Sequence, residues 1–332
     1  MSESTAISPQ KILSLAGGYW QPCALHCGVK LDVFTQLADK RLPATEVADR
    51  LNASLRGVEM LLNALTAMEL LDKNDKGFLA TEEARVLLDR KSSKYVGHMV
   101  MHHHHLVDGW SQLDQAVVTG RAVTTRSHGE ERERESFIMG MHNLSMSIAH
   151  RLAAQIDLTV RKQLLDLGGG PGVHAVHFCL ANPGLRATVL DRHTTEPFAR
   201  RTAEEAGVAD RVSFVGGDFL VDPLPVDHDA AWLSHIIHSC SPEECRHLIT
   251  RTVAALKPGG LIMIHDFFLD QTHAAPLFAA LFSLNMLIGN EGRSYGEDEV
   301  RQTLNDCGVT KVSRLDFTGP NQSGVLMGTL PE

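Results

Sequence analysis

The sequence from Arg161 onward alternates short apolar runs with longer stretches of helical spacing. The runs have the length of buried strands and read LLDL at 164–167, ATVL at 187–190, VSFV at 212–215, AAWL at 230–233 and LIMI at 261–264. Strands that alternate with helices in this way form a parallel sheet covered by helices. Near the end of the chain, VSRLDF and GVLMGTL flank GPNQS, which predicts an antiparallel hairpin at the sheet edge. We therefore expect an α/β domain with a doubly wound, Rossmann-like sheet.

The first part of the chain predicts a separate, mainly helical domain. From Gln10 to about Asp89 the apolar residues recur at helical spacing. Two helix starts, at Thr45 and Ser54, are followed by the turn NDKG at 74–77 and the run FLAT at 78–81, which is the pattern of a winged helix. Further helices are expected at about 92–118 and 135–155, separated by a polar segment at 119–135. We place the domain boundary between residues 155 and 156.

The charge balance argues against nucleic acid and anionic membranes as partners. The 332 residues include 40 acidic and 31 basic side chains, for a formal charge of −9, and such a chain repels phosphate groups. Between Ser54 and Leu65, the helix of the winged motif that would read DNA carries a single basic residue, Arg56, and one acidic residue, Glu59. Because DNA recognition needs several basic side chains, packing or dimerisation is the preferred role of this helix. A small-molecule substrate is more compatible with this composition.

Cysteine usage and the N-terminus predict a cytoplasmic protein. The six cysteines are scattered without the dense, regular spacing of a disulfide scaffold, so we expect reduced thiols. The first ten residues are polar and do not resemble a secretion signal.

A glycine-rich turn after the first predicted strand is the strongest local signal for a ligand. The segment LLDLGGGPG contains Asp166, Gly168, Gly169, Gly170 and Gly172. Glycines at a strand end let a ligand approach the backbone closely. At the end of the next strand, Asp191 offers a carboxylate that can accept hydrogen bonds from both ribose hydroxyls. Together they predict a nucleoside site, although the glycine spacing differs from the dinucleotide pattern G-x-G-x-x-G.

Two more strand ends carry candidate site residues. Asp218 and Phe219 can contact an adenine amino group and ring, although a loop-capping Asp beside a core Phe explains them equally well. After the strand AAWL, His238 precedes a strong helix start with Ser241 as N-cap. Histidine titrates near neutral pH, so His238 is a candidate general base. His235 is either a buried polar group or a pocket residue.

These motifs, in this order, resemble the small-molecule O-methyltransferases of the caffeic acid and acetylserotonin type, which use S-adenosylmethionine. The resemblance runs nearly end to end and rests on KLDVFTQLA, LLNALTAMELL, FIMGMHNLS, LLDLGGGPG, GGDF, HIIHSCSPEEC, LKPGG and LFSLNML. It implies a methyltransferase domain preceded by a winged-helix dimerisation domain. It also implies a homodimer in which the N-terminal domain of one subunit helps to close the partner's substrate pocket.

The resemblance also implies roles for individual residues. The implied cofactor contacts are Ser145, Gly168, Gly170, Asp191, Asp218 and Phe219. The positions that match the substrate pocket are Phe137, Met141, Met286 and Asn290, to which we add His235. His238 matches the catalytic base, and Asp266 matches an acidic residue that orients it.

The chain departs from the family pattern near this base. Ser239 and Cys240 follow His238 where the family has Asp and Trp, and Gly292 or Ser294 stands where a second acid is usual. The segment between Gly120 and Phe137 is also shorter than in the plant enzymes. O-methylation of a hydroxyl is the favoured activity. S-methylation of a thiol or thioether and C-methylation of a keto acid stay open, as does a non-catalytic winged-helix regulator.

A run of histidines at 98–105 could place metal ligands on one helix face. His98, His102 and His105 are spaced at i, i+4 and i+7. We expect a polar helix that lines a pocket or an interface and no metal, because no carboxylate or cysteine lies at a matching offset.

Overall fold

The computed structural model describes residues 7–124 and 131–332. Contacts divide the chain into two compact units, one of Met1–Leu106 with Glu135–Asn143 and the other of Val107–Arg134 with Leu144–Glu332. The boundary that we placed between residues 155 and 156 stays a prediction. None of the helices in the described ranges has the length and apolar character to cross a bilayer.

The N-terminal unit contains the predicted winged helix. Its first helices are α1 (Pro9–Ala16), α2 (Trp20–Lys30), α3 (Val33–Gln36), α4 (Ala44–Leu51), α5 (Leu55–Ala67) and α6 (Glu82–Leu88). Strands β1 (Leu71–Asn74) and β2 (Gly77–Ala80) form an antiparallel wing. Phe34, Leu62 and Leu65 are fully buried and anchor the core of this unit. Ser54 is the N-cap of α5 as predicted, whereas the N-cap of α4 is Pro43 and not Thr45, because the extended backbone at Pro43 precedes a helix that already includes Ala44.

The later helices of this part are more broken than predicted. The stretch expected from Ser92 begins as α7 (Gly97–Trp110) after a turn and continues as α8 (Leu113–Thr119). The next helices are α9 (Glu131–Met146), which begins earlier than the predicted start at 135, and α10 (Ala149–Gln155). Part of the polar segment predicted at 119–135 lies outside the described residues.

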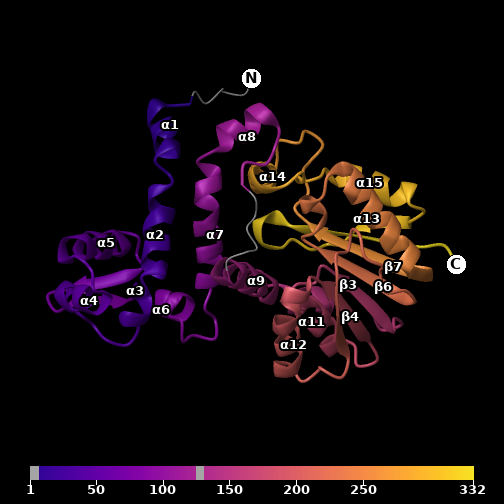
Figure 1. Ribbon diagram of the computed structural model, residues 1–332, viewed down its shortest axis with the longest axis horizontal. Helices are drawn as coiled ribbons and strands as arrows, with labels where there is room; N and C mark the ends of the chain where they lie inside the picture. Colours follow the sequence, from indigo (N-terminus) through magenta and orange to yellow (C-terminus); the bar gives the residue numbers. More distant parts are fainter. Residues whose placement is uncertain (1–6, 125–130) are drawn as a thin grey trace. The chain divides into compact units, whose positions relative to one another are not determined.

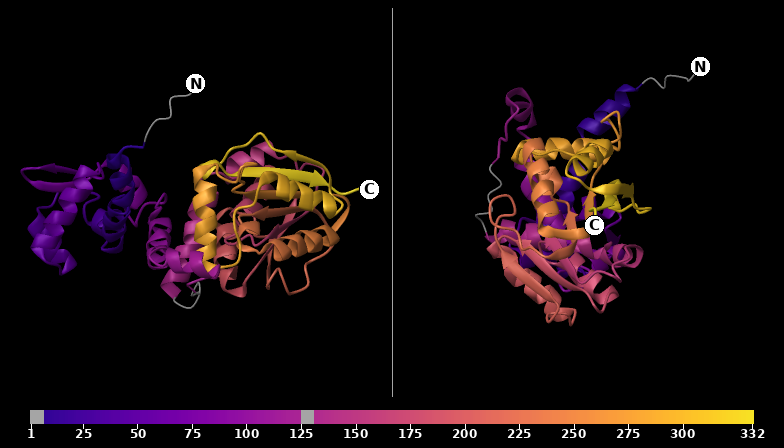
Figure 2. Two further views of the ribbon diagram at one scale, coloured as in Figure 1. Left: turned by 90° about the horizontal axis from the view of Figure 1, so that it is seen from above. Right: turned by 90° about the vertical axis from the view of Figure 1, so that its right-hand side faces the viewer.

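The C-terminal unit is built on the predicted sheet. Its strands are β3 (Gln163–Leu167), β4 (Arg186–Asp191), β5 (Val212–Gly216), β6 (His228–Ser234), β7 (Leu256–Asp266), β8 (Thr310–Arg314) and β9 (Gly324–Thr329). The order across the sheet is β5-β4-β3-β6-β7-β9-β8. The first five are parallel, and β9 pairs antiparallel with both β7 and β8. The C-terminal hairpin, yellow in Figure 2, therefore lies at one edge of the sheet, as predicted, although its first strand ends at Arg314.

Helices cover both faces of this sheet (Figure 1). On one side lie α11 (Val173–Ala181) and α12 (Glu196–Glu205), and on the other α13 (Pro242–Ala255) and α15 (Glu297–Asp306). Helix α14 (Leu277–Gly289) follows β7. Two apolar clusters, one for each face, contain fully buried residues such as Leu233 and Trp232 from alternate positions of β6. This alternation explains why β6 reads as a continuous apolar run.

The carboxyl ends of the parallel strands meet at one edge of the sheet. The glycine-rich turn follows β3, Asp191 ends β4, the turn with His238 follows β6, and Asp266 ends β7. Ligands bind at this edge in open α/β sheets, because the strand order reverses there between β3 and β6.

Candidate functional site

The glycine-rich turn after β3 has the conformation and the space that a bound ligand needs. Gly168 and Gly170 have φ angles of 63° and 55°, in the left-handed region that favours glycine. A Cβ at Gly168 would lie 2.4 Å from Ile236 Cδ1, whereas a Cβ at Gly170 would meet nothing within 4 Å. The backbone at Gly170 therefore borders open space, where a nucleoside can lie against it.

Asp191 ties this turn to the end of β4. Its Oδ2 accepts a hydrogen bond from the Gly170 N–H at 2.8 Å, and its Oδ1 accepts one from the Arg192 N–H at 2.7 Å. Burial raises the pKa of Asp191, while these two N–H groups oppose the rise. The carboxylate thus stands beside the turn, where it can also accept from a ribose.

Asp218 and Phe219 lie next to the same turn. The Gly217 N–H donates to the backbone oxygen of Asp191 at 2.9 Å, which joins their loop to the end of β4. The Phe219 ring lies 3.5 Å from the position of a Cβ at Gly168, and its exposed neighbour Asp218 accepts from the Leu220 N–H at 2.9 Å. Residues from three strand ends, those of β3, β4 and β5, therefore lie together at this edge of the sheet.

His238 lies in a short 3-10 turn, Ile237–Ser239, between β6 and α13. The helix start is the predicted capping box: the Ser241 hydroxyl accepts from the Glu244 N–H, and the Glu244 carboxylate accepts from the Ser241 N–H. The His238 Nδ1–Asp266 Oδ1 distance is 2.7 Å. With Nδ1–H donated to this carboxylate, Nε2 is left as the basic nitrogen.

The Asp266 carboxylate is buried and ionised. Burial opposes its ionisation, but the positive charge of protonated His238 and the contact with His235 hold the pKa of Asp266 well below its usual range. The Phe267 N–H donates a second hydrogen bond to Oδ1 at 2.8 Å. A fixed, charged partner of this kind selects the tautomer of a histidine and stabilises its protonated form.

Aromatic rings and one glycine surround His238, and sequence reasoning missed them. Phe282 of α14 lies edge-on to the His238 ring, with centroids 4.8 Å apart, and the Phe267 ring is stacked 6.2 Å away. A Cβ at Gly292 would lie 2.0 Å from the His238 backbone oxygen. Phe282 precedes the predicted Met286 by four residues, so helical spacing was the signal that could have identified it.

The predicted substrate residues are placed in different ways. Met286 of α14 is fully buried, and its Sδ lies 3.5 Å from Nδ2 of Asn290, which caps the helix. His235 lies beside Asp266, with Nδ1 3.7 Å from Oδ1. Phe137 and Met141 belong to the N-terminal unit and Ser145 lies in the last turn of α9, so the ligand contacts of these three stay predictions.

The α7 histidines do not gather as a metal site. Among the described residues, three side chains bring potential metal-ligand atoms within 4.8 Å of one another, and they are His235, His238 and Asp266. There the carboxylate already accepts two hydrogen bonds at Oδ1. This group contains the candidate base His238 and the acidic residue that we expect to orient it.

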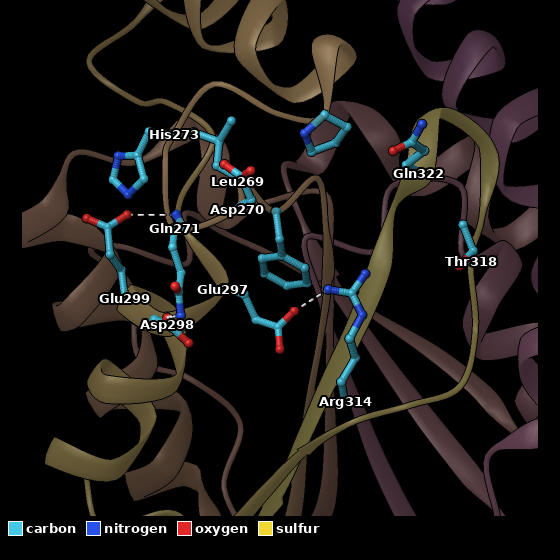
Figure 3. A pocket seen from close by; sticks show the side chains of 13 residues that line it. Leu269, Asp270, Gln271, His273, Glu297, Asp298, Glu299, Arg314, Thr318 and Gln322 are labelled. Carbon is cyan, nitrogen blue, oxygen red and sulfur yellow. Dashed lines mark hydrogen bonds and ion pairs between the residues drawn. The ribbon is translucent and has the colours of Figure 1, made fainter. Parts of the chain in front are cut away.

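A separate cavity of about 540 Å³ lies beside the loop after β7 (Figure 3). None of the predicted site residues lines it. Its carboxylates already have partners in the protein: Glu297 points to Arg314, and Glu299 accepts from the Gly296 N–H at 2.7 Å. These groups are committed to local structure.

Comparison with known proteins identifies the family. The model of an O-methyltransferase domain matches residues 103–310, and the model of an O-methyltransferase dimerisation domain matches residues 13–90. The chain belongs to the O-methyltransferase family. It is an S-adenosylmethionine-dependent methyltransferase that acts on small molecules.

Relatives of this O-methyltransferase cover almost the whole chain. It is 32% identical to the 3-hydroxy-5-methyl-1-naphthoate 3-O-methyltransferase of Streptomyces sahachiroi, over 96% of this chain and 95% of that protein. It is 33% identical to the tetracenomycin polyketide synthesis 8-O-methyl transferase of Streptomyces glaucescens, over 94% and 95%. The solved structure of human N-acetylserotonin methyltransferase with S-adenosylmethionine has a TM-score of 0.88 at 25% identity and covers all of both chains.

Proposed function

We propose that this enzyme methylates a hydroxyl group on a small aromatic acceptor, with His238 as the general base and Asp266 as the residue that orients it. The observation that carries this proposal is the 2.7 Å hydrogen bond between His238 Nδ1 and Asp266 Oδ1, at the same sheet edge as the glycine-rich turn. The relatives' names support the acceptor class, since one acts on a hydroxynaphthoate and one on a polyketide.

The residues around the turn fit S-adenosylmethionine. Gly170 borders open space, and the carboxylates of Asp191 and Asp218 supply the acceptors that a ribose and an adenine amino group need. Gly168, Phe219 and Ser145 complete the proposed set. When bound, the cofactor supplies a methyl group that its sulfonium has already activated.

The protein's own contribution is to align the acceptor and remove its proton. His238 Nε2 takes the hydroxyl proton, and Asp266 stabilises the resulting imidazolium through Nδ1–H. The rings of Phe267 and Phe282 exclude water from the base. We propose that Phe137, Met141, Met286 and Asn290 contact the acceptor.

The dimerisation domain supports a homodimer. Helix α1 has no buried residue, and Leu13 and Leu15 are 71% and 70% exposed in the isolated chain. Apolar side chains gathered on one helix are typical of a protein–protein interface. We propose that a second copy of the chain covers them.

Calorimetric titration with S-adenosylhomocysteine tests the cofactor site. We expect micromolar binding to the wild type, at least a tenfold weaker affinity for Asp191→Ala, and no change for the control Asp210→Ala, whose side chain is exposed. Equal binding to Asp191→Ala and wild type would remove Asp191 from the site.

Methyl transfer to 3-hydroxy-5-methyl-1-naphthoate, the acceptor in one relative's name, tests the base. His238→Asn should lose about 10²–10⁴-fold in kcat and still bind S-adenosylhomocysteine. A loss below about tenfold would show that methyl transfer to this hydroxyl does not need His238 as the base.

A further inference from the structure

His235 faces the same carboxylate oxygen as the proposed base. Its Nδ1 lies 3.7 Å from Asp266 Oδ1, while His238 Nδ1 lies 2.7 Å from that atom. The His235 side chain is 13% exposed, and its Nδ1 is buried without a hydrogen-bond partner among the described residues. A buried polar nitrogen beside a carboxylate calls for an explanation, because an unmade hydrogen bond is costly there.

The backbone and its neighbours hold His235 in this place. Its φ of 56° is in the left-handed region, which is uncommon for residues with a side chain. Its N–H donates to the His265 backbone oxygen at 2.8 Å. Its ring lies against the rings of His265 and Phe267, with centroids 4.4 and 4.5 Å away. The side chain is therefore directed toward Asp266 by contacts on two sides.

The tautomer of His235 follows from the charge that it faces. A lone pair on Nδ1 would be repelled by the ionised Asp266, whereas an N–H on Nδ1 is attracted to it. The 3.7 Å separation is longer than a hydrogen bond, but such contacts are often long in enzymes without substrate and shorten when substrate binds.

We propose that His235 is a positioning residue: it directs Nδ1–H at Asp266 Oδ1 and shares this carboxylate with His238. The inference rests on the proposed role of His238 as the base. A donor at Oδ1 draws negative charge away from the His238 side of the carboxylate, so it weakens the stabilisation of the His238 imidazolium. His235 thereby moderates how strongly Asp266 stabilises the protonated His238 ring.

The other titratable groups near His235 and His238 carry no competing charge. His265, which lies in β7, is fully buried and forms hydrogen bonds with the hydroxyls of Ser234 and Ser323, at 2.9 and 3.0 Å. Burial raises the pKa of the Cys240 thiol, in the loop after His238, to about 12, so it stays protonated. From α11, His174 is fully buried, and burial lowers its pKa to about 3. From α14, Phe282 faces His238 and carries no charge.

Two variants separate the hydrogen bond from the packing. His235→Phe keeps an aromatic ring and removes the nitrogen. His235→Asn places an amide nitrogen close to the Nδ1 position, and Asn tolerates the left-handed backbone well. Both are prepared as the full chain with S-adenosylhomocysteine present.

The readout is the titration of the His238 ring by 15N NMR, with its signal assigned from the His238→Asn variant. We expect His235→Phe to move the titration midpoint upward by about half to one pH unit, and His235→Asn to stay close to wild type. The pH profile of kcat/KM with 3-hydroxy-5-methyl-1-naphthoate should move in parallel. Thermal unfolding and S-adenosylhomocysteine affinity report whether each variant is folded.

A titration midpoint of His238 that is unchanged or moves downward in folded His235→Phe would overturn the inference. A shift of equal size in both variants would also overturn it, because it would assign the effect to packing. The NMR titration needs no acceptor, so it is informative even where His238→Asn keeps full activity, a result that would refute only the proposed base.

Discussion

At the scale of single residues, two buried side chains oppose each other in their effect on pH-dependent stability. Burial raises the pKa of Asp166 from its ordinary value of 3.8 to about 7, and burial lowers the pKa of His174 from its ordinary value of 6.5 to about 3. Asp166 Oδ1 and both ring nitrogens of His174 are buried without partners among the described residues. The Ala175 N–H donates to Asp166 Oδ2 at 3.2 Å and opposes the rise, but burial outweighs this single hydrogen bond.

The sign of each effect follows from which state holds the proton. Folded Asp166 binds a proton more tightly than the unfolded chain, so its contribution to stability falls as pH rises from about 4 to about 7. Folded His174 binds a proton less tightly, so its contribution falls as pH drops from about 6.5 toward 3. Between about pH 4 and 6.5 the two contributions largely cancel in the wild type.

Single variants should reveal the pH-dependent contributions of Asp166 and His174 to stability. Relative to wild type, Asp166→Asn should gain stability as pH rises from 4.5 to 7.5, and His174→Phe should gain stability as pH falls over the same range, each on the order of 2 kcal/mol. Differential scanning calorimetry at several pH values measures both trends. Two variants that change in parallel with pH would contradict this assignment.

At the scale of elements, the loop after α14 supports the turn that carries His238. A Cβ at Gly292 would lie 2.0 Å from the His238 oxygen and 2.7 Å from the Ser239 carbonyl carbon, and both are backbone atoms that cannot rotate away. The His238 turn therefore keeps its place only while residue 292 has no side chain.

We expect Gly292→Ala to lower kcat about tenfold or more, because a displaced base loses alignment with the acceptor. Affinity for S-adenosylhomocysteine should stay within about twofold, since the glycine-rich turn belongs to another strand end. The matched control is Gly57→Ala in α5, where a Cβ meets nothing within 4 Å. Equal activity in the two variants would show that the turn tolerates the shift.

At the scale of the whole molecule, the exposed apolar side chains of α1 should control the oligomeric state. The double variant Leu13→Glu with Leu15→Glu buries two charges in the proposed interface, so it should be monomeric by sedimentation velocity while the wild type is dimeric. Val160→Glu is the control, because Val160 is 76% exposed and lies in the other unit. A dimeric double variant would place the interface elsewhere.

The sequence by itself determined the local parts of this molecule. Short apolar runs specify strands, Ser241 and Glu244 specify the start of α13, and the glycines after β3 specify a turn whose backbone angles residues with a side chain rarely adopt. These signals need only neighbours in the chain, and for that reason the strands, their helices and the glycine-rich turn were predicted correctly.

Only the tertiary structure decided what surrounds His238. Asp266 is 28 residues away along the chain and reaches it because β6 and β7 are paired in register. The resemblance indicated that pairing, and helical spacing from Met286 could have indicated Phe282. Nothing in the local pattern indicated the packing of Gly292 or the direction of the His235 side chain. That direction depends on a single left-handed backbone angle and on ring contacts with residues of another strand, which are fixed by packing between elements and leave no periodic trace in the sequence.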